Sequence, residues 1–278
     1  MQREDIERAA RALKQAEAVV VCAGAGIGVD SGLPDFRGDN GFWKAYPVLE
    51  GRKVNFVEMA NPRWFDSDPA LAWGFYGHRF NLYRDTMPHE GFAMLRRLET
   101  RLGKPSFVFT SNVDGQFQKA GVREDRIVEY HGSLQWFQCT RACRENIWEA
   151  GDLRFDVDLA TLKLRGEPPY CPHCGRVARP ALLMFGDATW VDERTSDQLI
   201  HFGEFLRATA SKRLAIIETG AGYHVPTVRR QAERLAREPG ATLIRINPRD
   251  LEGKGPAIEL RMGAKEGLLA IEEVLQSL

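Results

Sequence analysis

The chain has 278 residues, of which 44% are hydrophobic and 27% charged, so its composition is that of a globular protein long enough to bury a sizeable core. The formal net charge is zero, which excludes a broad electrostatic footprint for nucleic acid or anionic lipid. The first residues lack the basic-then-apolar order of a secretory signal, and no apolar stretch approaches the length of a membrane span. We therefore expect a cytoplasmic protein with no nucleic-acid or membrane partner, whose cysteines are free thiols or metal ligands rather than disulfides.

Helical periodicity and short apolar runs alternate along the chain. The pattern predicts helices over residues 3–16, 64–86, 89–102, 227–237 and 265–277, and a loop over residues 35–46. It predicts buried strands over residues 19–21, 106–109, 127–130, 214–217 and 243–246. Short, continuously apolar strands separated by helices are typical of a parallel sheet covered on both faces. In such a sheet the loops that follow the strands meet at one edge, where ligands bind.

A glycine-rich turn follows the first of these strands, with Gly24, Gly26 and Gly28 at alternate positions. Glycine lets backbone N–H groups approach a diphosphate, because a Cβ would keep the ligand away. The spacing is not Gly-x-Gly-x-x-Gly, and no acidic residue follows at the end of a second strand about 20 residues on, which argues against an ordinary dehydrogenase. On the glycines alone, a tight turn without a ligand is an equally good interpretation.

The residues after the glycines favour a ligand. The stretch from Gly24 to Gly38, with its Gly-Ala-Gly and Pro-Asp-Phe-Arg segments, resembles the NAD-binding signature of the sirtuin family. In that family the glycine turn binds the diphosphate of NAD, and the Pro-Asp-Phe-Arg segment belongs to a mobile loop over the nicotinamide ribose. The resemblance therefore implies cofactor contacts at Ala23, Gly24, Ala25, Gly26, Asp35, Phe36 and Arg37.

Two further segments at predicted strand ends carry the same resemblance. Thr-Ser-Asn-Val-Asp resembles the sirtuin Thr-Gln-Asn-Ile-Asp motif, which implies that Asn112 lies at the ribose and Asp114 at the nicotinamide carboxamide. The alternative is a simple polar turn after a strand. Glu-Tyr-His-Gly-Ser resembles the segment of the catalytic histidine, and an ordinary imidazole pKa near 6.5 suits His131 as a general base.

Four cysteines form two knuckles, Cys139-x-x-x-Cys143 and Cys171-x-x-Cys174. Their spacing and a reducing compartment predict a closed tetrahedral Zn²⁺ site. Because protein sulfur atoms would fill every position around the metal, we expect a structural site without chemistry. A four-cysteine ribbon is also a feature of the sirtuin family.

The second half of the chain resembles the sirtuin substrate cleft. Phe185 stands in the Phe-Gly-acidic loop, which in the family lines a tunnel for the acyl-lysine and adds an extended peptide to the loop backbone. Gly220 and Val225 belong to a second loop that departs from the usual Gly-Thr-Ser, and Asn247 matches the residue at the adenosine ribose. Without the resemblance, the first segment is a buried strand and a turn.

Tyr76 and Arg79 resemble a Tyr-x-x-Arg pair of sirtuins that prefer acidic acyl groups such as succinyl. Arg79 would pair with a carboxylate and Tyr76 would add a hydrogen bond. The alternative is a helix with an aromatic core face and a surface arginine.

Taken together, the resemblance implies an α/β protein, with a Rossmann-like domain over residues 1–40, 88–135 and 180–278, a helical insertion over 41–87 and a zinc ribbon over 136–179. It implies that NAD is consumed as an acyl-lysine protein or peptide is deacylated: the acyl oxygen attacks the ribose, nicotinamide leaves, and His131 helps to deprotonate a ribose hydroxyl. Two alternatives stay open. The same fold transfers ADP-ribose or hydrolyses NAD, or the chain is a non-enzymatic NAD-sensing module.

Overall fold

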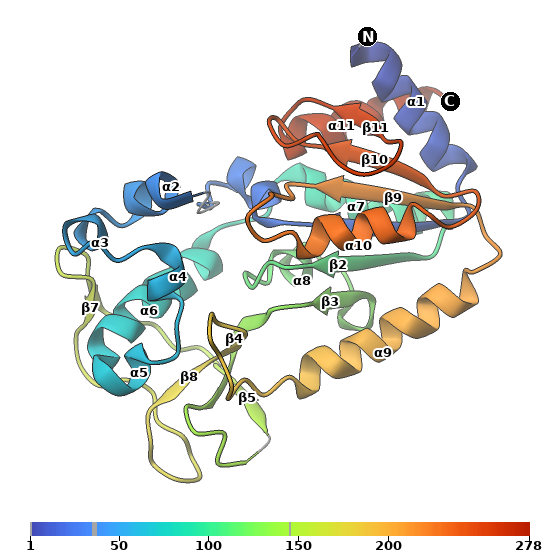
Figure 1. The fold of residues 1–278 in the computed structure, drawn as a ribbon. Helices are drawn as coiled ribbons and strands as arrows, with labels where there is room; N and C mark the ends of the chain where they lie inside the picture. Colours follow the sequence, from blue (N-terminus) through green and yellow to red (C-terminus); the bar gives the residue numbers. More distant parts are fainter. Residues whose placement is uncertain (1, 35–37, 145) are drawn as a thin grey trace.

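The larger part of the molecule is built on a six-stranded parallel sheet with helices against both faces (Figure 1). The computed structural model describes residues 2–34, 38–144 and 146–278. The strands are β1 (Ala18–Ala23), β2 (Ser106–Thr110), β3 (Ile127–Glu129), β9 (Leu214–Thr219), β10 (Thr242–Ile246) and β11 (Ile258–Leu260). Every strand predicted from the sequence is present in this sheet, and the predicted parallel, doubly covered arrangement is confirmed.

The strand order β11-β10-β9-β1-β2-β3 positions the functional part of the sheet. The chain first builds outward from β1 through β2 to β3, and then returns to the other side of β1 with β9. The order therefore reverses between β1 and β9. In open parallel sheets, ligands bind outside the carboxyl ends of the strands at such a reversal.

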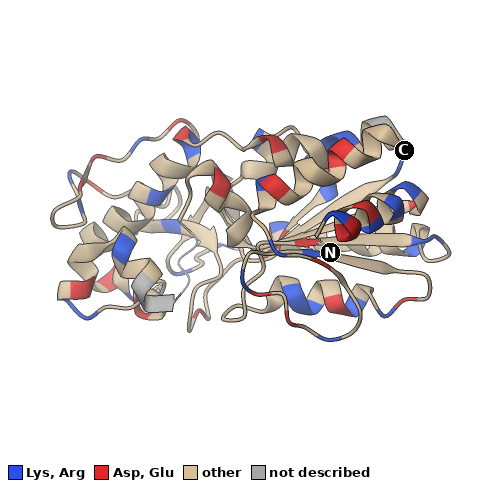
Figure 2. Cartoon of the chain, turned by 90° about the horizontal axis from the view of Figure 1, so that it is seen from above, with Lys and Arg blue, Asp and Glu red and all other residues tan. Residues whose placement is uncertain are grey.

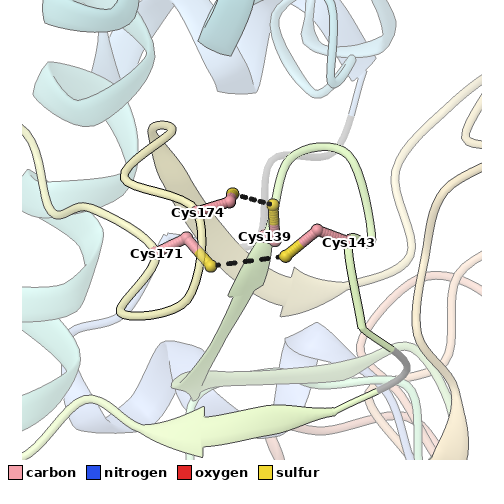
Figure 3. Close-up of side chains that lie close together, drawn as sticks. All are labelled: Cys139, Cys143, Cys171 and Cys174. Atoms are coloured by element: carbon pink, nitrogen blue, oxygen red, sulfur yellow. Dashed lines mark hydrogen bonds between the residues drawn. The ribbon is translucent and has the colours of Figure 1, made fainter.

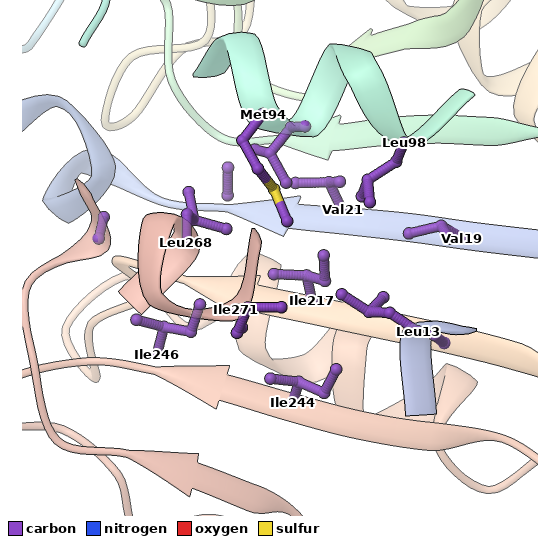
Figure 4. Packing of buried hydrophobic residues seen from close by; sticks show 14 of the residues in the cluster. Leu13, Val19, Val21, Met94, Leu98, Ile217, Ile244, Ile246, Leu268 and Ile271 are labelled. Carbon is purple, nitrogen blue, oxygen red and sulfur yellow. The ribbon is translucent and has the colours of Figure 1, made fainter. Parts of the chain in front are cut away.

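Two hydrophobic clusters bind the helices to the sheet. Side chains that alternate along the strands, such as Val19 and Val21 against Val20 and Cys22, belong to the clusters on opposite faces. On one face lie α1 (Gln2–Gln15), α7 (Glu90–Leu102) and α11 (Ala264–Ser277), whose Leu13, Met94, Leu98, Leu268 and Ile271 appear in Figure 4. On the other lie α9 (Glu193–Ala208) and α10 (Thr227–Leu235).

A smaller module extends from the carboxyl edge of the sheet (Figure 1). Its helices are α2 (Gly38–Ala45), α3 (Pro47–Gly51), α4 (Phe56–Met59), α5 (Trp64–Ser67) and α6 (Pro69–Asp85). Its antiparallel strands are β4 (Gly132–Cys139), β5 (Ile147–Glu149), β6 (Val157–Asp158), β7 (Lys163–Leu164) and β8 (Ala178–Leu182). The short helix α8 (Gln116–Lys119) connects β2 and β3 and packs with the core of the parallel sheet. The helix predicted over residues 64–86 is interrupted at Asp68, which separates α5 from α6. In α6, Trp73 stacks on Phe155 with ring centroids 4.9 Å apart. A third hydrophobic cluster thus holds this module together.

The predicted loop over residues 35–46 is wrong where the structure describes it, because Gly38–Ala45 is helical. The helix directs Phe42 toward the module core. There the Phe42 ring packs against the ring of Tyr46, one turn later, with ring centroids 5.5 Å apart. Both rings meet Phe75 of α6, at 6.0 and 5.1 Å. The glycine and asparagine of this stretch favour a loop, but burial of two rings against α6 favours the helix.

Helix α9 was not predicted from the sequence. Its buried positions, which include Thr195, Gln198, Phe202 and Phe205, are half polar, so the apolar periodicity is weak. Positive and negative side chains are interspersed along the helices of both modules (Figure 2). None of the described helices combines the length and apolar character that crossing a membrane requires.

Candidate active site and metal centre

The register of the sheet aligns the last residues of neighbouring strands. Ile246 lies beside Thr219, Thr219 beside Ala23, Ala23 beside Thr110, and Thr110 beside Glu129. The loops that follow these residues therefore start from one edge. They carry the predicted glycine turn, Asn112, His131, Gly220 and Asn247, as the sequence led us to expect.

The glycine turn packs backbone against backbone on the loop after β9. The Gly24 and Gly26 N–H groups donate to the carbonyls of Thr219 and Gly220, each at 3.0 Å. A Cβ on Gly24 would lie 2.7 Å from the Gly220 oxygen, and one on Gly220 would lie 2.2 Å from the Ile27 nitrogen. Gly220 also has a φ of +64°, which favours glycine. The two loops can approach this closely only because both positions lack a side chain.

Asn112 is fixed against this turn by a short relay of hydrogen bonds. The Thr110 hydroxyl donates to the Ala23 carbonyl at 2.8 Å and accepts from the Asn112 N–H at 3.0 Å. The Asn112 side-chain amide then donates to the Gly24 carbonyl at 3.2 Å. Asn112 is 8% exposed, so a buried polar side chain is held in one orientation beside the glycines.

His131 is the second residue of the two-residue turn between β3 and β4. Gly132 has a φ of +78°, and a Cβ there would lie 2.3 Å from the Ala181 oxygen, so β4 must start with a glycine. The Leu183 N–H donates to the His131 carbonyl at 2.9 Å. The imidazole Nε2 faces the Thr227 hydroxyl at 3.4 Å. Burial lowers the pKa of His131, while a backbone hydrogen bond with Ser111 raises it, so the imidazole is neutral at pH 7.

Asp114 lies two residues beyond Asn112. Its Oδ1 accepts from the Gln116 N–H at 2.9 Å. Burial raises the pKa of Asp114 to about 6, against the hydrogen bond from Gln116 and the charge of Arg79, which lower it. A carboxyl that titrates close to neutral pH in a cleft is a functional-site candidate.

The Asn247 loop is tied to the Gly220 loop at the far side of the reversal. The Asn247 amide donates to the Ala221 carbonyl at 2.8 Å, and its Oδ1 accepts from the N–H groups of Arg249 and Asp250. Beneath it, Arg245 forms a bidentate pair with Glu218, at 2.8 and 3.1 Å. This buried pair was not predicted, because no local sequence pattern marks two charged residues inside apolar strands as partners.

Two of the four predicted substrate residues, Phe185 and Val225, are exposed apolar side chains on different loops. Phe185 is 37% exposed, and its N–H donates to the Ala60 carbonyl at 2.9 Å, which fixes its loop to the helical module. The loop is also held from beneath, because Asp187 forms a fully buried bidentate pair with Arg179 at 2.7 and 2.9 Å. Val225 is 42% exposed on the loop that leads into α10.

Tyr76 and Arg79 lie inside the helical module, and the surface-arginine alternative does not hold, since Arg79 is 6% exposed. Arg79 Nε and Nη2 donate to the Tyr83 hydroxyl at 3.1 and 2.8 Å. The buried Tyr76 hydroxyl has no hydrogen-bond partner among the described residues. The positive charge of Arg79 lowers the pKa of Asp114, so Arg79 is within electrostatic range of the loop that follows β2.

The four predicted cysteines gather at one place (Figure 3). Cys139 and Cys174 sulfurs are 3.6 Å apart, as are those of Cys143 and Cys171, and all four lie within 4.8 Å of one another. Thiolates around a tetrahedral Zn²⁺ are about 3.8 Å apart, from Zn–S bonds of about 2.3 Å. Burial raises the pKa of Cys139, but N–H groups of Cys143 and Arg141 lower it to about 7. The donor set fits zinc without rearrangement.

Three predicted cofactor residues fall in a part of the chain that the structure does not describe. Asp35, Phe36 and Arg37 lie outside the described residues. Two residues not predicted from the sequence also lie here: Thr219, whose buried hydroxyl at the reversal has no partner among the described residues, and Thr227, whose hydroxyl faces His131. The strand-end position of Thr219 was a signal that could have identified it.

Comparison with known proteins assigns the chain to a family. The profile of the Sir2 family matches residues 24–209, which is most of the chain. This chain belongs to the Sir2 family. The NAD-dependent protein deacylase of Aeropyrum pernix is 33% identical over 95% of this chain and 94% of its own length, and that of Thermococcus kodakarensis is 36% identical over 93% and 90%.

Solved Sir2 structures share the fold over nearly the whole chain. A mutant Sir2 homologue in complex with ADP ribose has a TM-score of 0.68, with 25% identity over 97% of this chain and 96% of that one. A Sir2 homologue in complex with NAD has a TM-score of 0.66, with 25% identity over 98% and 94%. The resemblance to sirtuins seen in the sequence is therefore confirmed, and so is the fold class.

Proposed function

We propose that this Sir2 protein is an NAD-dependent protein-lysine deacylase, which consumes NAD and releases nicotinamide and an O-acyl-ADP-ribose. The observation that carries the proposal is that the glycine turn, Asn112 and His131 follow the aligned ends of three neighbouring strands, β1, β2 and β3, at one edge of the sheet. Relatives along nearly the full length bear the name of such a deacylase, and a Sir2 homologue has been solved with NAD. The protein is proposed to act in the cytoplasm, where reduced cysteines can hold zinc.

In this proposal NAD lies across the strand ends. The backbone of the glycine turn faces the diphosphate, Asn247 faces the adenosine ribose, and the amide of Asn112 is held beside the second ribose. Asp114 accepts from the nicotinamide carboxamide in its ionised form. Cofactor contacts at Ala23, Ala25, Gly26, Gly220 and the segment 35–37 belong to the same proposal.

The acyl-lysine enters from the side opposite to NAD. Its path lies between the Rossmann-like part and the two insertions, which are residues 41–87 and 136–179. Phe185 and Val225 are exposed apolar side chains that can contact the substrate there. His131 acts as the general base, because a neutral imidazole has a free lone pair for a proton from a ribose hydroxyl. NAD supplies the leaving group, and the protein supplies orientation.

A Zn²⁺ ion held by Cys139, Cys143, Cys171 and Cys174 would supply a structural cross-link. With four thiolates, the ion has no position open to water. Every chemical role in the proposal therefore falls to side chains at the strand ends.

The acyl preference is a finer part of the proposal. Tyr76 presents a buried hydroxyl without a partner among the described residues, and Arg79 supplies a buried cation on the same helix. These features support acceptance of an acyl chain with a terminal carboxylate, such as succinyl, in addition to acetyl.

The test is nicotinamide release from NAD with no peptide, with acetyl-lysine peptide and with succinyl-lysine peptide. We expect release to require an acyl peptide, and His131→Ala to lose deacylation by roughly 10²–10⁴-fold, the usual contribution of a general base. Release that is independent of peptide would instead assign ADP-ribose transfer or NAD hydrolysis. Tight NAD binding without turnover of any substrate would indicate a sensing module.

A further inference from the structure

The strand that leads to His131 is the edge of the parallel sheet. Strand β3 has only three residues and pairs with β2 on one side. An edge strand leaves a row of backbone N–H and C=O groups without a ladder partner, and a short edge strand is held by few hydrogen bonds. What covers the outer side of β3 therefore decides how firmly the turn at His131 is held.

Helix α9 covers that side with polar side chains instead of a strand. The Gln198 side chain accepts from the Glu129 N–H at 3.0 Å, and the Thr195 hydroxyl donates to the Glu129 carbonyl at 3.1 Å. Both side chains are almost fully buried, at 6% and 5% exposure. Together they satisfy the two backbone groups of Glu129 that face away from β2, as a neighbouring strand would do.

The Glu129 side chain is held by the same helix. Arg194 Nη1 lies 2.7 Å from Glu129 Oε2, and Arg194 Nη2 lies 3.0 Å from Glu124 Oε2. Thus three residues within two turns of α9 contact Glu129, at its N–H, its carbonyl and its carboxylate. Glu129 is separated from His131 by a single residue, whose N–H donates to the Thr110 carbonyl at 2.8 Å.

The start of α9 is anchored in turn to the small module. The side chain of Gln138, a fully buried residue of β4, donates to the Thr189 carbonyl at 2.7 Å and accepts from the Val191 N–H at 3.0 Å. These residues immediately precede the helix. The segment over residues 189–198 therefore connects the Phe185 loop with Glu129. It is held by the buried side-chain amide of Gln138 at its start and by that of Gln198 at its end.

We propose that Thr195 and Gln198 are positioning residues for the deacylation reaction, because they hold Glu129 and with it the turn that presents His131. Neither touches the substrate. They act through β3, whose outer edge they complete. The expected effect on kcat rests on the proposed function. The expected effect on amide hydrogen exchange in β3 can be measured without any substrate.

The chain offers a matched pair of threonines for the test. Thr209, at the other end of α9, is also buried, at 6% exposure, and its hydroxyl also donates to a backbone carbonyl, that of Phe205 at 2.8 Å. Thr195→Val and Thr209→Val thus remove the same kind of hydrogen bond from the same helix. Only the first bond reaches β3. Thr195→Ser keeps the hydroxyl and serves as the rescue variant.

The full-length protein is assayed with NAD and acetyl-lysine peptide, at a temperature where all variants are folded. We expect Thr195→Val to lower kcat roughly tenfold with little change in KM for NAD, since small displacements of a catalytic group are costly. Thr195→Ser should restore most of the rate, and Thr209→Val should keep it. Amide hydrogen exchange of residues 127–132 should become faster in Thr195→Val alone. If Thr195→Val does not fold, Gln198→Met provides the same two measurements.

The proposal is overturned if Thr195→Val keeps both the kcat and the exchange rates of the unmodified protein, or if Thr209→Val lowers kcat equally. An equal loss in both variants would mean that general destabilisation of α9 is responsible. If the unmodified protein shows no deacylation, the proposed function fails, and the exchange of residues 127–132 still decides whether Thr195 holds the strand.

Discussion

Burial shifts the pKa values of two side chains that follow strand ends, downward for His131 and upward for Asp114. The neutral imidazole of His131 and the titratable carboxyl of Asp114 both follow from burial, which disfavours the charged form of each group. Burial of this kind is useful for binding and chemistry, and it is costly for folding. Substitutions of two buried charged side chains, Asp114 and Arg79, test the effects on folding and on binding.

Asp114→Asn should stabilise the fold at alkaline pH and weaken NAD use. The pKa of Asp114 is about 6, above its ordinary 3.8, so the ionised carboxylate destabilises the folded state above pH 6 and this cost is gone below pH 3.8. We expect the variant to gain on the order of 1–3 kcal/mol in unfolding free energy at pH 8, and nothing at about pH 4. Urea unfolding at both pH values measures this, and a gain that did not depend on pH would contradict it.

Arg79→Met should reduce desuccinylation far more than deacetylation. Loss of one partner of a buried carboxylate pair costs about 2–5 kcal/mol in binding, whereas an acetyl group has no carboxylate to lose. The measurement is kcat/KM for the two peptides. Arg84→Met is the matched control, because Arg84 lies on the same helix and its guanidinium stacks on Phe80 at 4.6 Å. Equal losses on both peptides in Arg79→Met would rule out recognition of the acyl carboxylate.

Whole elements meet at the active site through backbone contacts that exclude side chains. The turn after β1 and the loop after β9 cross at Gly24 and Gly220, and β4 starts against β8 at Gly132. These contacts fix how closely the loops after the strands approach one another. Their consequence can be tested at Gly220, where both a positive φ and a close contact require glycine.

Gly220→Ala should destabilise the protein and abolish tight NAD binding. A Cβ at this position would lie 2.2 Å from the Ile27 nitrogen, so the two loops must separate. Gly255→Ala is the control, since Gly255 has a φ of +85° but no atom within 4 Å of its would-be Cβ. That variant should lose only the conformational cost, about 1 kcal/mol or somewhat more. Calorimetric NAD titration compares them, and equal affinity in both would argue against the crossing.

At the scale of the whole molecule, the sheet and the small module have separate hydrophobic cores, and the cysteine site belongs to the small module. The parallel sheet has its own apolar layers, while the small module depends on aromatic packing and on the cross-link near β4 and β8. Strand β8 leads directly to the Phe185 loop, and β4 follows His131. We therefore expect the geometry of the proposed substrate side to depend on the cysteine site.

Removal of zinc should disable the substrate side and leave the sheet folded. We expect about one zinc per chain by elemental analysis. Cys174→Ser should lose the metal and deacylase activity, with a lower unfolding midpoint, because metal binding contributes to folding free energy. Cys22→Ala is the control: Cys22 is fully buried in β1, away from the cluster, so this variant should keep its zinc. Full activity in zinc-free protein would contradict a structural role.

Local patterns were sufficient to predict much of this protein. Apolar runs such as Val19–Val21 are strands because residues buried on both faces of a sheet must be apolar, and this requirement is visible in the sequence. Glycines at strand ends and paired cysteine knuckles are likewise local signals of backbone approach and metal binding. They predicted correctly the sheet, the start of the strand-end loops from one edge, and the cysteine cluster.

Only the tertiary structure decided what depends on distant partners. The helix Gly38–Ala45 forms because Phe42 packs on Phe75, and α9 forms with polar residues on its buried face because Thr195 and Gln198 bond to the edge strand. Glu218 and Arg245 are charges inside apolar strands, which burial tolerates only as a pair. The sequence by itself determined which residues can line the site. The spatial arrangement of buried polar groups determined how firmly each of them is held.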